Sequence, residues 1–333
     1  MKKLINDPED VLSEFMRGFS IAHKDIVEYK TDPVHFHRAG GAVQGKTGLV
    51  SGGGSGHEPL GGGYVGAGML DAVAPGAFFS SPTPDQILAA TEAANGGAGV
   101  LHLVLNYTGD ILNFEMAAEL AAAEDIEVAT VVIDDDVAVE NSTWTAGRRG
   151  VAGAIAAMKM TGAATDLGYD LAKTAEVCTK INDSMGTMGL ALTACTVPTA
   201  GKPSFDLGPD EIELGIGVHG EPGVKRVPMM QVDEIVDVLV DAVVKDLKFE
   251  RGENVLLYIN GLGATPLSEQ YIMYNHAWDK LDALGVNVTR SQVGNYFTSL
   301  EMAGASVTIM RLDEELTKLY DAPVHTAGWR KGV

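Results

Sequence analysis

The chain is poor in cysteine and in positive charge, and both shortages limit what it can be. Its 333 residues include only two cysteines, Cys178 and Cys195. Two are too few for a disulfide framework, and their spacing does not suit a metal site. The 24 lysines and arginines are outnumbered by 45 aspartates and glutamates, which gives a net charge of −21. Because this charge repels phosphate backbones and anionic lipids, we expect no direct binding of nucleic acid. The two cysteines fit a reducing cytoplasm, where we expect the protein to be located.

Long apolar runs are also lacking. No segment approaches the roughly 20 apolar residues that a membrane-spanning helix needs. The basic start, Met1–Ile5, is followed at once by the polar stretch Asn6–Asp10, which leaves no apolar region for a signal peptide. With 46% hydrophobic and 21% charged residues, the composition is that of an ordinary globular protein of about two domains. We therefore expect no membrane association.

The first half of the chain alternates short apolar runs with helical patterns. Val100–Leu105 and Val128–Ile133 are typical of buried strands. A helix is expected to begin at Asp7, and the sequence Ser81–Asp85 starts another with an N-cap and a first-turn proline. Strand, loop and helix in alternation predict a largely parallel α/β sheet with helices on both faces. We assign this N-terminal domain to residues 1–185.

In the second half, strands outnumber helices. Only two long helices are expected there, over 232–246 and 269–284. The expected strands are 190–194, 212–218, 255–260, 286–293 and 307–312. This pattern predicts a smaller C-terminal α+β domain over residues 186–333.

A glycine run with a histidine follows the strand expected at 46–51. Glycines let the backbone approach a ligand closely, and open α/β sheets bind ligands at the carboxyl ends of their strands. The run ends in His57, Glu58 and Pro59, so the imidazole of His57 is expected to be accessible, although a core role is equally compatible with the sequence. Asp110 ends the loop after 100–105 and fits either a helix cap or a catalytic carboxylate.

A third candidate lies in the second half. His219 follows the strand expected at 212–218 and is flanked by Gly217 and Gly220. Together with His57 and Asp110 it provides two imidazoles and one carboxylate at strand ends. Such a set suits a small polar substrate held between two sheets.

Three other patterns are interpreted as structural. Gly40–Thr47 matches the phosphate-loop pattern, but a strand rather than a helix is expected to follow it. Gly53–His57 lacks the last glycine of a nucleophile elbow. Three adjacent acids, Asp134–Asp136, could bind a divalent ion, but we favour a solvated turn. The chain is therefore expected to bind no nucleotide or metal.

At the candidate residues the sequence resembles the dihydroxyacetone-binding, K-type subunit of the bacterial multi-subunit dihydroxyacetone kinase. The resemblance runs nearly from end to end. The matching segments are Ser51–Pro59, Ser81–Asp85, Asn106–Phe114, Val131–Val139, Thr145–Gly150, Ala194–Pro198, Gly201–Phe205, Val218–Gly223, Gly263–Glu269 and Ala322–Thr326. So many separate motifs in one order are more specific than any single motif above.

The resemblance implies a two-domain subunit, usually a homodimer, that acts as a phosphotransferase only with a partner. It would hold dihydroxyacetone, or a close short ketose, while a separate subunit carrying the nucleotide and Mg²⁺ transfers the phosphoryl group. His219 would add to the carbonyl carbon and form a hemiaminal. His57 and Asp110 would lie near the reacting hydroxyl, one of them as base. The resemblance also implies backbone contacts to the substrate from the segment Gly54-Ser55-Gly56.

The sequence departs from the family at two positions. The family usually has lysine where this chain has Leu105, and commonly histidine where it has Gly61. These changes keep an alternative open: a non-catalytic, ketose-sensing paralogue that co-activates a transcription regulator. The phosphoryl donor also stays open between a phosphoenolpyruvate-fed carrier and ATP. A self-sufficient kinase that uses Gly40–Thr47 is not expected.

Overall fold

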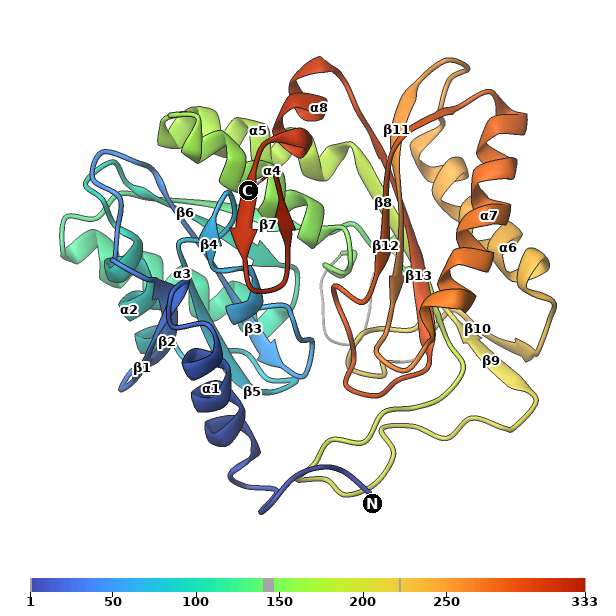
Figure 1. The fold of residues 1–333 in the computed structure, drawn as a ribbon, viewed down its shortest axis with the longest axis horizontal. Helices are drawn as coiled ribbons and strands as arrows, with labels where there is room; N and C mark the ends of the chain where they lie inside the picture. The colour runs from blue at the N-terminus through green and yellow to red at the C-terminus, as the bar shows by residue number, and fades with distance from the viewer. Residues whose placement is uncertain (1, 140–146, 222, 333) are drawn as a thin grey trace.

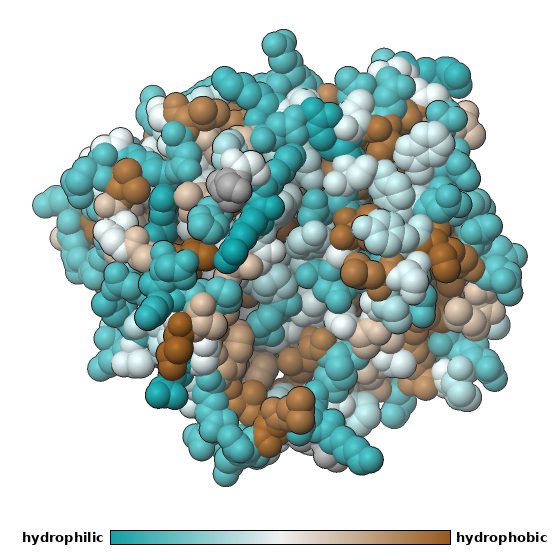
Figure 2. All heavy atoms as spheres, viewed as in Figure 1, coloured by the Kyte–Doolittle hydropathy of each residue, from teal (hydrophilic) through white to brown (hydrophobic). Residues whose placement is uncertain are grey.

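The computed structural model describes residues 2–139, 147–221 and 223–332. Thr145 and Pro222, which belong to two of the matching motifs, lie outside this part. Two six-stranded sheets, one from each half of the chain, lie side by side (Figure 1). Among the described residues, no helix is both long and apolar enough to cross a membrane. Most of the face shown in Figure 2 is hydrophilic, with smaller hydrophobic groups over both halves.

The first sheet confirms the predicted largely parallel α/β half. Its order is β1-β2-β5-β3-β6-β7. The strands β5, β3, β6 and β7 run parallel, and β1 and β2 form an antiparallel edge. The strand bounds are β1 Val27–Thr31, β2 Val34–Arg38, β3 Gly48–Ser55, β5 Ala72–Phe78, β6 Val100–Leu105 and β7 Val128–Ile133.

Helices cover both faces of this sheet, as predicted. Val50 of β3 packs in the cluster formed with α2 and α3, and its neighbour Leu49 packs in the cluster formed with α4 and α5. Both side chains are fully buried, because successive residues of a strand point to opposite faces. The helix bounds are α1 Val11–Ala22, α2 Pro84–Ala94, α3 Thr108–Ala123, α4 Ala154–Asp166 and α5 Leu171–Asp183.

The helix starts test the sequence interpretation directly. At α2 the prediction is confirmed: the Thr83 N–H donates to Gln86 Oε1 at 2.9 Å, as in a capping box. At α1 it is wrong, because the helix begins at Val11 and the preceding residues form a turn in which Asp7 accepts from the Glu9 N–H.

The second sheet has the predicted α+β character. Its order is β10-β9-β8-β13-β11-β12, and only β11 and β12 pair in parallel. Helices α6 and α7 lie together beside the sheet (Figure 1). The bounds are β8 Met185–Ala191, β9 Glu211–Leu214, β10 Lys225–Pro228, α6 Val232–Leu247, β11 Asn254–Gly261, α7 Leu267–Leu284, β12 Asn287–Gly294 and β13 Gly304–Arg311.

The last part of the chain returns to the first half. Helix α8 (Glu314–Asp321) packs on α4, and β14 (Val324–Thr326) pairs with both β4 (Gly66–Ala67) and β15 (Arg330–Lys331). The remaining regular element is a short 3₁₀ helix over Gly62–Tyr64. The second large sheet begins at Met185. The division into domains 1–185 and 186–333 stays a prediction.

The glycine run differs from its expected form. It was expected to be a loop, but β3 continues through Gly52, Gly53 and Gly54 to Ser55. A Cβ at Gly52 would lie 2.8 Å from the Ala74 carbonyl oxygen, and one at Gly54 would lie 2.6 Å from the Ser80 nitrogen. Gly52 therefore serves close backbone packing within the sheet and Gly54 close packing against the loop after β5, and the loop after β3 begins only at Gly56.

Candidate functional site

A cavity of about 540 Å³ lies at the carboxyl ends of the parallel strands. The end of β3, the loop after β5 and the segment from Tyr107 into α3 line it from the first half, and the segment after β9 closes it from the second. This is the end of an open α/β sheet where ligands bind. Its lining residues are Gly54, Phe79, Ser80, Ser81, Tyr107, Thr108, Gly109, Asp110, His219, Gly220 and Glu221.

His219 is held in one orientation by Glu221. The Nδ1 atom of His219 lies 2.8 Å from Glu221 Oε1, and its backbone N–H donates to Oε2 at 3.0 Å. Because a carboxylate only accepts, Nδ1 carries the proton, and in the neutral ring Nε2 then keeps a free lone pair. Burial by itself raises the pKa of Glu221, but the bond and charge of His219, together with Arg149, lower it to about 2. The site therefore pairs a carboxylate with an imidazole whose Nε2 is a nucleophile.

Behind Glu221 lies a buried ion pair. The Arg149 side chain is 1% exposed, and it donates to Asp136 Oδ2 from Nε at 2.7 Å and to the Gly215 carbonyl oxygen from Nη2 at 2.7 Å. Asp135 is also buried and accepts from the Val151 N–H at 2.8 Å.

The interpretation of Asp134–Asp136 as a solvated turn is therefore wrong, because tertiary contacts bury two of the three acids. In the part of the chain that the structure describes, no group of three or more histidine, cysteine or acidic side chains could hold a metal ion.

Asp110 is a buried carboxylate with spare hydrogen-bonding capacity. It lies in the first turn of α3, where it makes no side-chain cap, and it is 5% exposed. Its Oδ1 atom has no hydrogen-bond partner. Burial raises the pKa of Asp110 to about 6, and a hydrogen bond from Ser81 opposes part of this rise. A carboxylate of this kind can accept a proton near neutral pH.

His57 contacts His219 but does not line the cavity. The two rings meet edge to face with centroids 4.9 Å apart, and Phe79 stacks on His57 at 5.0 Å. The Nδ1–H of His57 donates to the Thr298 carbonyl oxygen at 2.8 Å, which leaves Nε2 buried as an acceptor without a partner. Burial, with a smaller effect of the His219 charge, lowers the pKa of His57 to about 3, so the ring is neutral.

Of the remaining predicted site residues, only one lines the cavity. Gly54 lines the cavity, whereas Ser55 and Gly56 lie beside it. The Ser55 hydroxyl donates to the Gly76 carbonyl oxygen at 2.7 Å, and the Gly56 N–H donates to Glu58 at 2.9 Å. Backbone contacts from Ser55 and Gly56 to a substrate therefore stay a prediction.

The two family departures lie away from the cavity lining. Leu105 is 4% exposed and belongs to the hydrophobic core, and Gly61 lines a different cavity. Lys46, the lysine of the phosphate-loop pattern, pairs with the buried Asp71 at 2.5 Å, and the chain continues into β3 instead of a helix.

Most of the lining residues, Glu221 among them, were not candidate site residues in the sequence interpretation. Ser81 and Tyr107 belong to matching motifs, so their presence in the site has a sequence signal. Tyr107 packs its ring against His219 with centroids 4.8 Å apart, and its hydroxyl is buried without a partner. Phe79 has a left-handed backbone, φ +54°, which only the tertiary structure reveals.

Comparisons with known proteins agree over nearly the whole chain. Residues 17–328 match the model of the Dak1 domain. The chain is 46% identical to the dihydroxyacetone-binding subunit DhaK of the phosphoenolpyruvate-dependent dihydroxyacetone kinase of Escherichia coli, over 98% of both chains. It is 48% identical to a phosphotransferase-system-dependent counterpart from Listeria innocua, over 99% of this chain and 100% of that one.

Solved structures show the same fold. A dihydroxyacetone kinase operon co-activator, DhaQ, matches with a TM-score of 0.90 and 30% identity, over 98% of this chain and 99% of that one. The dihydroxyacetone kinase of C. freundii, in complex with AMP-PNP and Mg²⁺, matches with a TM-score of 0.88 and 30% identity. The match covers 99% of this chain but 61% of that longer one.

Proposed function

The chain belongs to the Dak1 domain family, and we propose that it is the dihydroxyacetone-binding subunit of a dihydroxyacetone kinase. The observation that supports this best is the bond between His219 and Glu221 at the wall of a polar cavity, with Asp110 in the same lining. The resemblance assigned His219 to substrate capture and Asp110 to transfer, whereas the contact of Glu221 with His219 comes from the structure.

Capture begins at the free lone pair of His219 Nε2. This nitrogen attacks the carbonyl carbon of dihydroxyacetone, and the C=O π bond breaks as the N–C bond forms. The carbonyl oxygen takes up a proton from water, and the Nδ1 proton passes by way of the Glu221 carboxylate to the hydroxide that remains, which becomes water again. The product is a neutral hemiaminal. Until the proton leaves, the Glu221 carboxylate balances the positive charge of the ring.

Covalent capture compensates for the small size of the substrate. A ligand gains at most about 1.5 kcal/mol per non-hydrogen atom, so a triose binds weakly by contacts alone. The added bond compensates for this. It also rejects glycerol, which has no carbonyl group, so discrimination depends on reactivity rather than on shape.

Transfer requires a base near the substrate hydroxyl. We assign this role to Asp110, because its pKa of about 6 lies much closer to working pH than the value of about 3 for His57. The buried Nε2 of His57 keeps a lone pair beside His219. We assign it the acceptance of a hydrogen bond from the bound substrate.

The phosphoryl group would come from another polypeptide. The C. freundii kinase, whose structure contains AMP-PNP and Mg²⁺, is much longer than the part matched here, whereas the E. coli and Listeria innocua subunits are matched over nearly their full length. The E. coli kinase is dependent on phosphoenolpyruvate and the Listeria innocua kinase on the phosphotransferase system. This favours a phosphoenolpyruvate-fed carrier over ATP as the donor. We therefore expect a partner subunit to bind the nucleotide and Mg²⁺. We expect this chain itself to form a cytoplasmic homodimer.

The co-activator alternative has weaker support. DhaQ shares the fold at 30% identity, while the kinase subunits of E. coli and Listeria innocua share 46% and 48%. The departures at Leu105 and Gly61, which motivated the alternative, lie outside the lining of the 540 Å³ cavity. The kinase subunit is therefore the better proposal.

The test combines adduct detection with turnover. Carbon-13 NMR of dihydroxyacetone labelled at C2 is expected to show loss of the ketone carbonyl resonance with the native chain and with His276→Ala, a change on α7. His219→Ala is expected to abolish this change. With a cognate nucleotide-loaded subunit, the native chain is expected to yield dihydroxyacetone phosphate. An adduct without turnover would favour the co-activator, and an intact carbonyl would refute covalent capture.

A further inference from the structure

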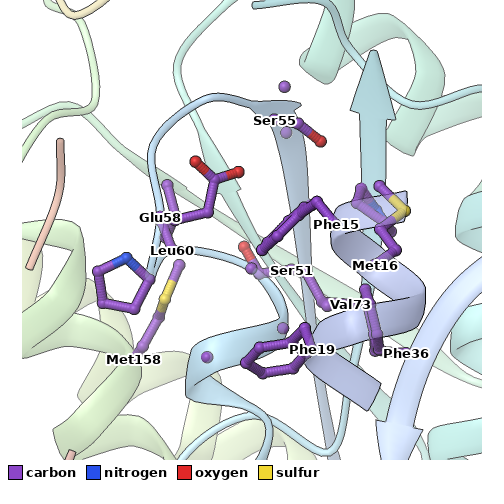
Figure 3. Close-up of a pocket in the computed structure, with 18 residues that line it drawn as sticks. Phe15, Met16, Phe19, Phe36, Ser51, Ser55, Glu58, Leu60, Val73 and Met158 are labelled. Atoms are coloured by element: carbon purple, nitrogen blue, oxygen red, sulfur yellow. The ribbon is translucent and has the colours of Figure 1, made fainter. Parts of the chain in front are cut away.

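A second cavity, of about 300 Å³, lies between α1 and the sheet (Figure 3). Its walls are mostly apolar. Of the residues that line it, only Gly54 also lines the 540 Å³ cavity, so the two spaces are separate. The labelled side chains of Figure 3 that form the apolar wall are Phe15, Met16, Phe19, Phe36, Leu60, Val73 and Met158.

Three polar side chains interrupt this wall: Ser51, Ser55 and Glu58. The Ser55 hydroxyl already donates to the Gly76 carbonyl oxygen. Ser51 is 1% exposed, and its hydroxyl is buried without a hydrogen-bond partner. Glu58 lines the same space, and its Oε1 atom accepts only from the Gly56 N–H among its bonds to described residues. A buried hydroxyl left unpaired costs free energy, so a ligand that bonds to Ser51 recovers it.

The charges of the lining restrict the ligand. It contains one acid, Glu58, and no lysine, arginine or histidine. A carboxylate or phosphate would therefore meet no cation and would be repelled. A ligand hydroxyl can accept from Ser51 and donate to Glu58 at the same time. The apolar side chains would contact the rest of the molecule.

The glycines at Gly61 to Gly63 leave room for a ligand. A Cβ at Gly62 would lie 3.0 Å from the Phe19 ring, so a larger residue there would press into the cavity. Access is expected along α1. Phe15, on α1, is 38% exposed. Met16 is the one buried residue of α1 in the part of the chain that the structure describes. Helix α1 is therefore held over the cavity by Met16 together with the partly buried Leu12 and Phe19.

We propose that this cavity binds a small, uncharged, apolar molecule that carries one hydroxyl group. The volume of the cavity limits the size of this ligand. An engineered cavity of about 150 Å³ holds benzene, and this one has about twice that volume. The ligand class is therefore an aromatic or branched aliphatic alcohol of about a dozen non-hydrogen atoms or fewer.

The first test measures binding to the full chain by calorimetry, without any ketose, so it does not depend on the proposed kinase function. The probe is 2-phenylethanol. Ethylbenzene, which lacks the hydroxyl, and 3-phenylpropionate, which is an anion, are both expected to bind at least about fivefold more weakly. Three outcomes would overturn the proposal. They are no binding of the alcohol, equal binding of the anion, and tighter binding of the cation 2-phenylethylamine than of the alcohol.

Two variants locate the site. Ser51→Ala is expected to weaken 2-phenylethanol binding about five- to tenfold without lowering stability, because its hydroxyl has no partner to lose. Leu60→Trp is expected to fill the cavity and abolish binding. Leu267→Trp, the same change at an exposed residue of α7, is expected to leave it unchanged. Undiminished binding by a folded Leu60→Trp chain would place the alcohol elsewhere and refute this site.

Discussion

The Nδ1 atom of His219 lies 2.8 Å from Oε1 of Glu221. Glu221 is therefore expected to determine which ring nitrogen is free to react. Glu221→Gln keeps the size of the side chain but removes its charge, and we expect it to reduce adduct formation by about 10- to 100-fold, since bonds to charged groups contribute about 1.5–3 kcal/mol. Carbon-13 NMR of the labelled ketose measures the adduct. Glu115→Gln, on the exposed side of α3, is the matched control. An unchanged adduct level in Glu221→Gln would contradict this role.

The rate of transfer is expected to depend on the ionisation of Asp110. A base acts only when deprotonated, and burial raises the pKa of Asp110 to about 6. Turnover with the partner subunit should therefore fall as the pH drops through about 6. Asp110→Asn should lower kcat by about 10²- to 10⁴-fold and remove this acid limb, while the adduct on His219 still forms. A pH–rate profile of both chains tests this, and an acid limb that persists in Asp110→Asn would assign it to another group.

The same carboxyl is expected to lower stability at neutral pH. The pKa of Asp110 is raised from 3.8 to about 6 by burial, so the folded state disfavours the ionised form by at most ~3 kcal/mol. Asp110→Asn should thus increase the free energy of unfolding at pH 7.5 by about 1–2 kcal/mol, less than the maximum because the Ser81 hydrogen bond is weakened. The gain should shrink between pH 6 and pH 4, where the native carboxyl becomes protonated. Urea unfolding of both chains at pH 6 and at pH 4 measures this. An equal difference in the free energy of unfolding at the two pH values would contradict the prediction.

Arg149 and Asp136 form a buried pair that is expected to respond unequally to single and double changes. Arg149→Leu leaves the Asp136 charge buried without its partner, and we expect a loss of about 3–5 kcal/mol in the free energy of unfolding. Adding Asp136→Leu removes the stranded charge. The double variant should therefore lose less than the sum of the two single losses. Urea unfolding of all four chains measures the coupling, and strict additivity would show that the pair does not interact.

Gly54 is expected to tolerate no side chain. A Cβ there would lie 2.6 Å from the Ser80 nitrogen and 2.8 Å from Phe79 Cα. Gly54→Ala should therefore displace the loop that lines the cavity, cost about 1–3 kcal/mol of stability and reduce adduct formation. Gly18→Ala is the matched control. Its Cβ would meet nothing within 4 Å in α1, and the better helix propensity of alanine should stabilise the chain by about 0.5–1 kcal/mol. Equal effects of the two changes would contradict this account.

Local patterns in the sequence were sufficient for much of the fold. Strands β6 and β7 have the predicted bounds, and the capping box at Thr83 starts α2 as expected. These features depend on neighbouring residues, through side-chain alternation and capping. At α1 the local pattern was misleading, because Asp7 accepts from the Glu9 N–H in a turn and the helix begins at Val11.

By itself the sequence determined the acidic character of the chain, the two kinds of sheet and the candidates His57, Asp110 and His219. Only the tertiary structure decided that Glu221 orients His219, that His57 lies behind the cavity, and that two acids of 134–136 are buried. The physical reason is that orientation and ionisation depend on burial and on partners far along the chain. Thr298, for example, binds His57 across 241 positions of sequence.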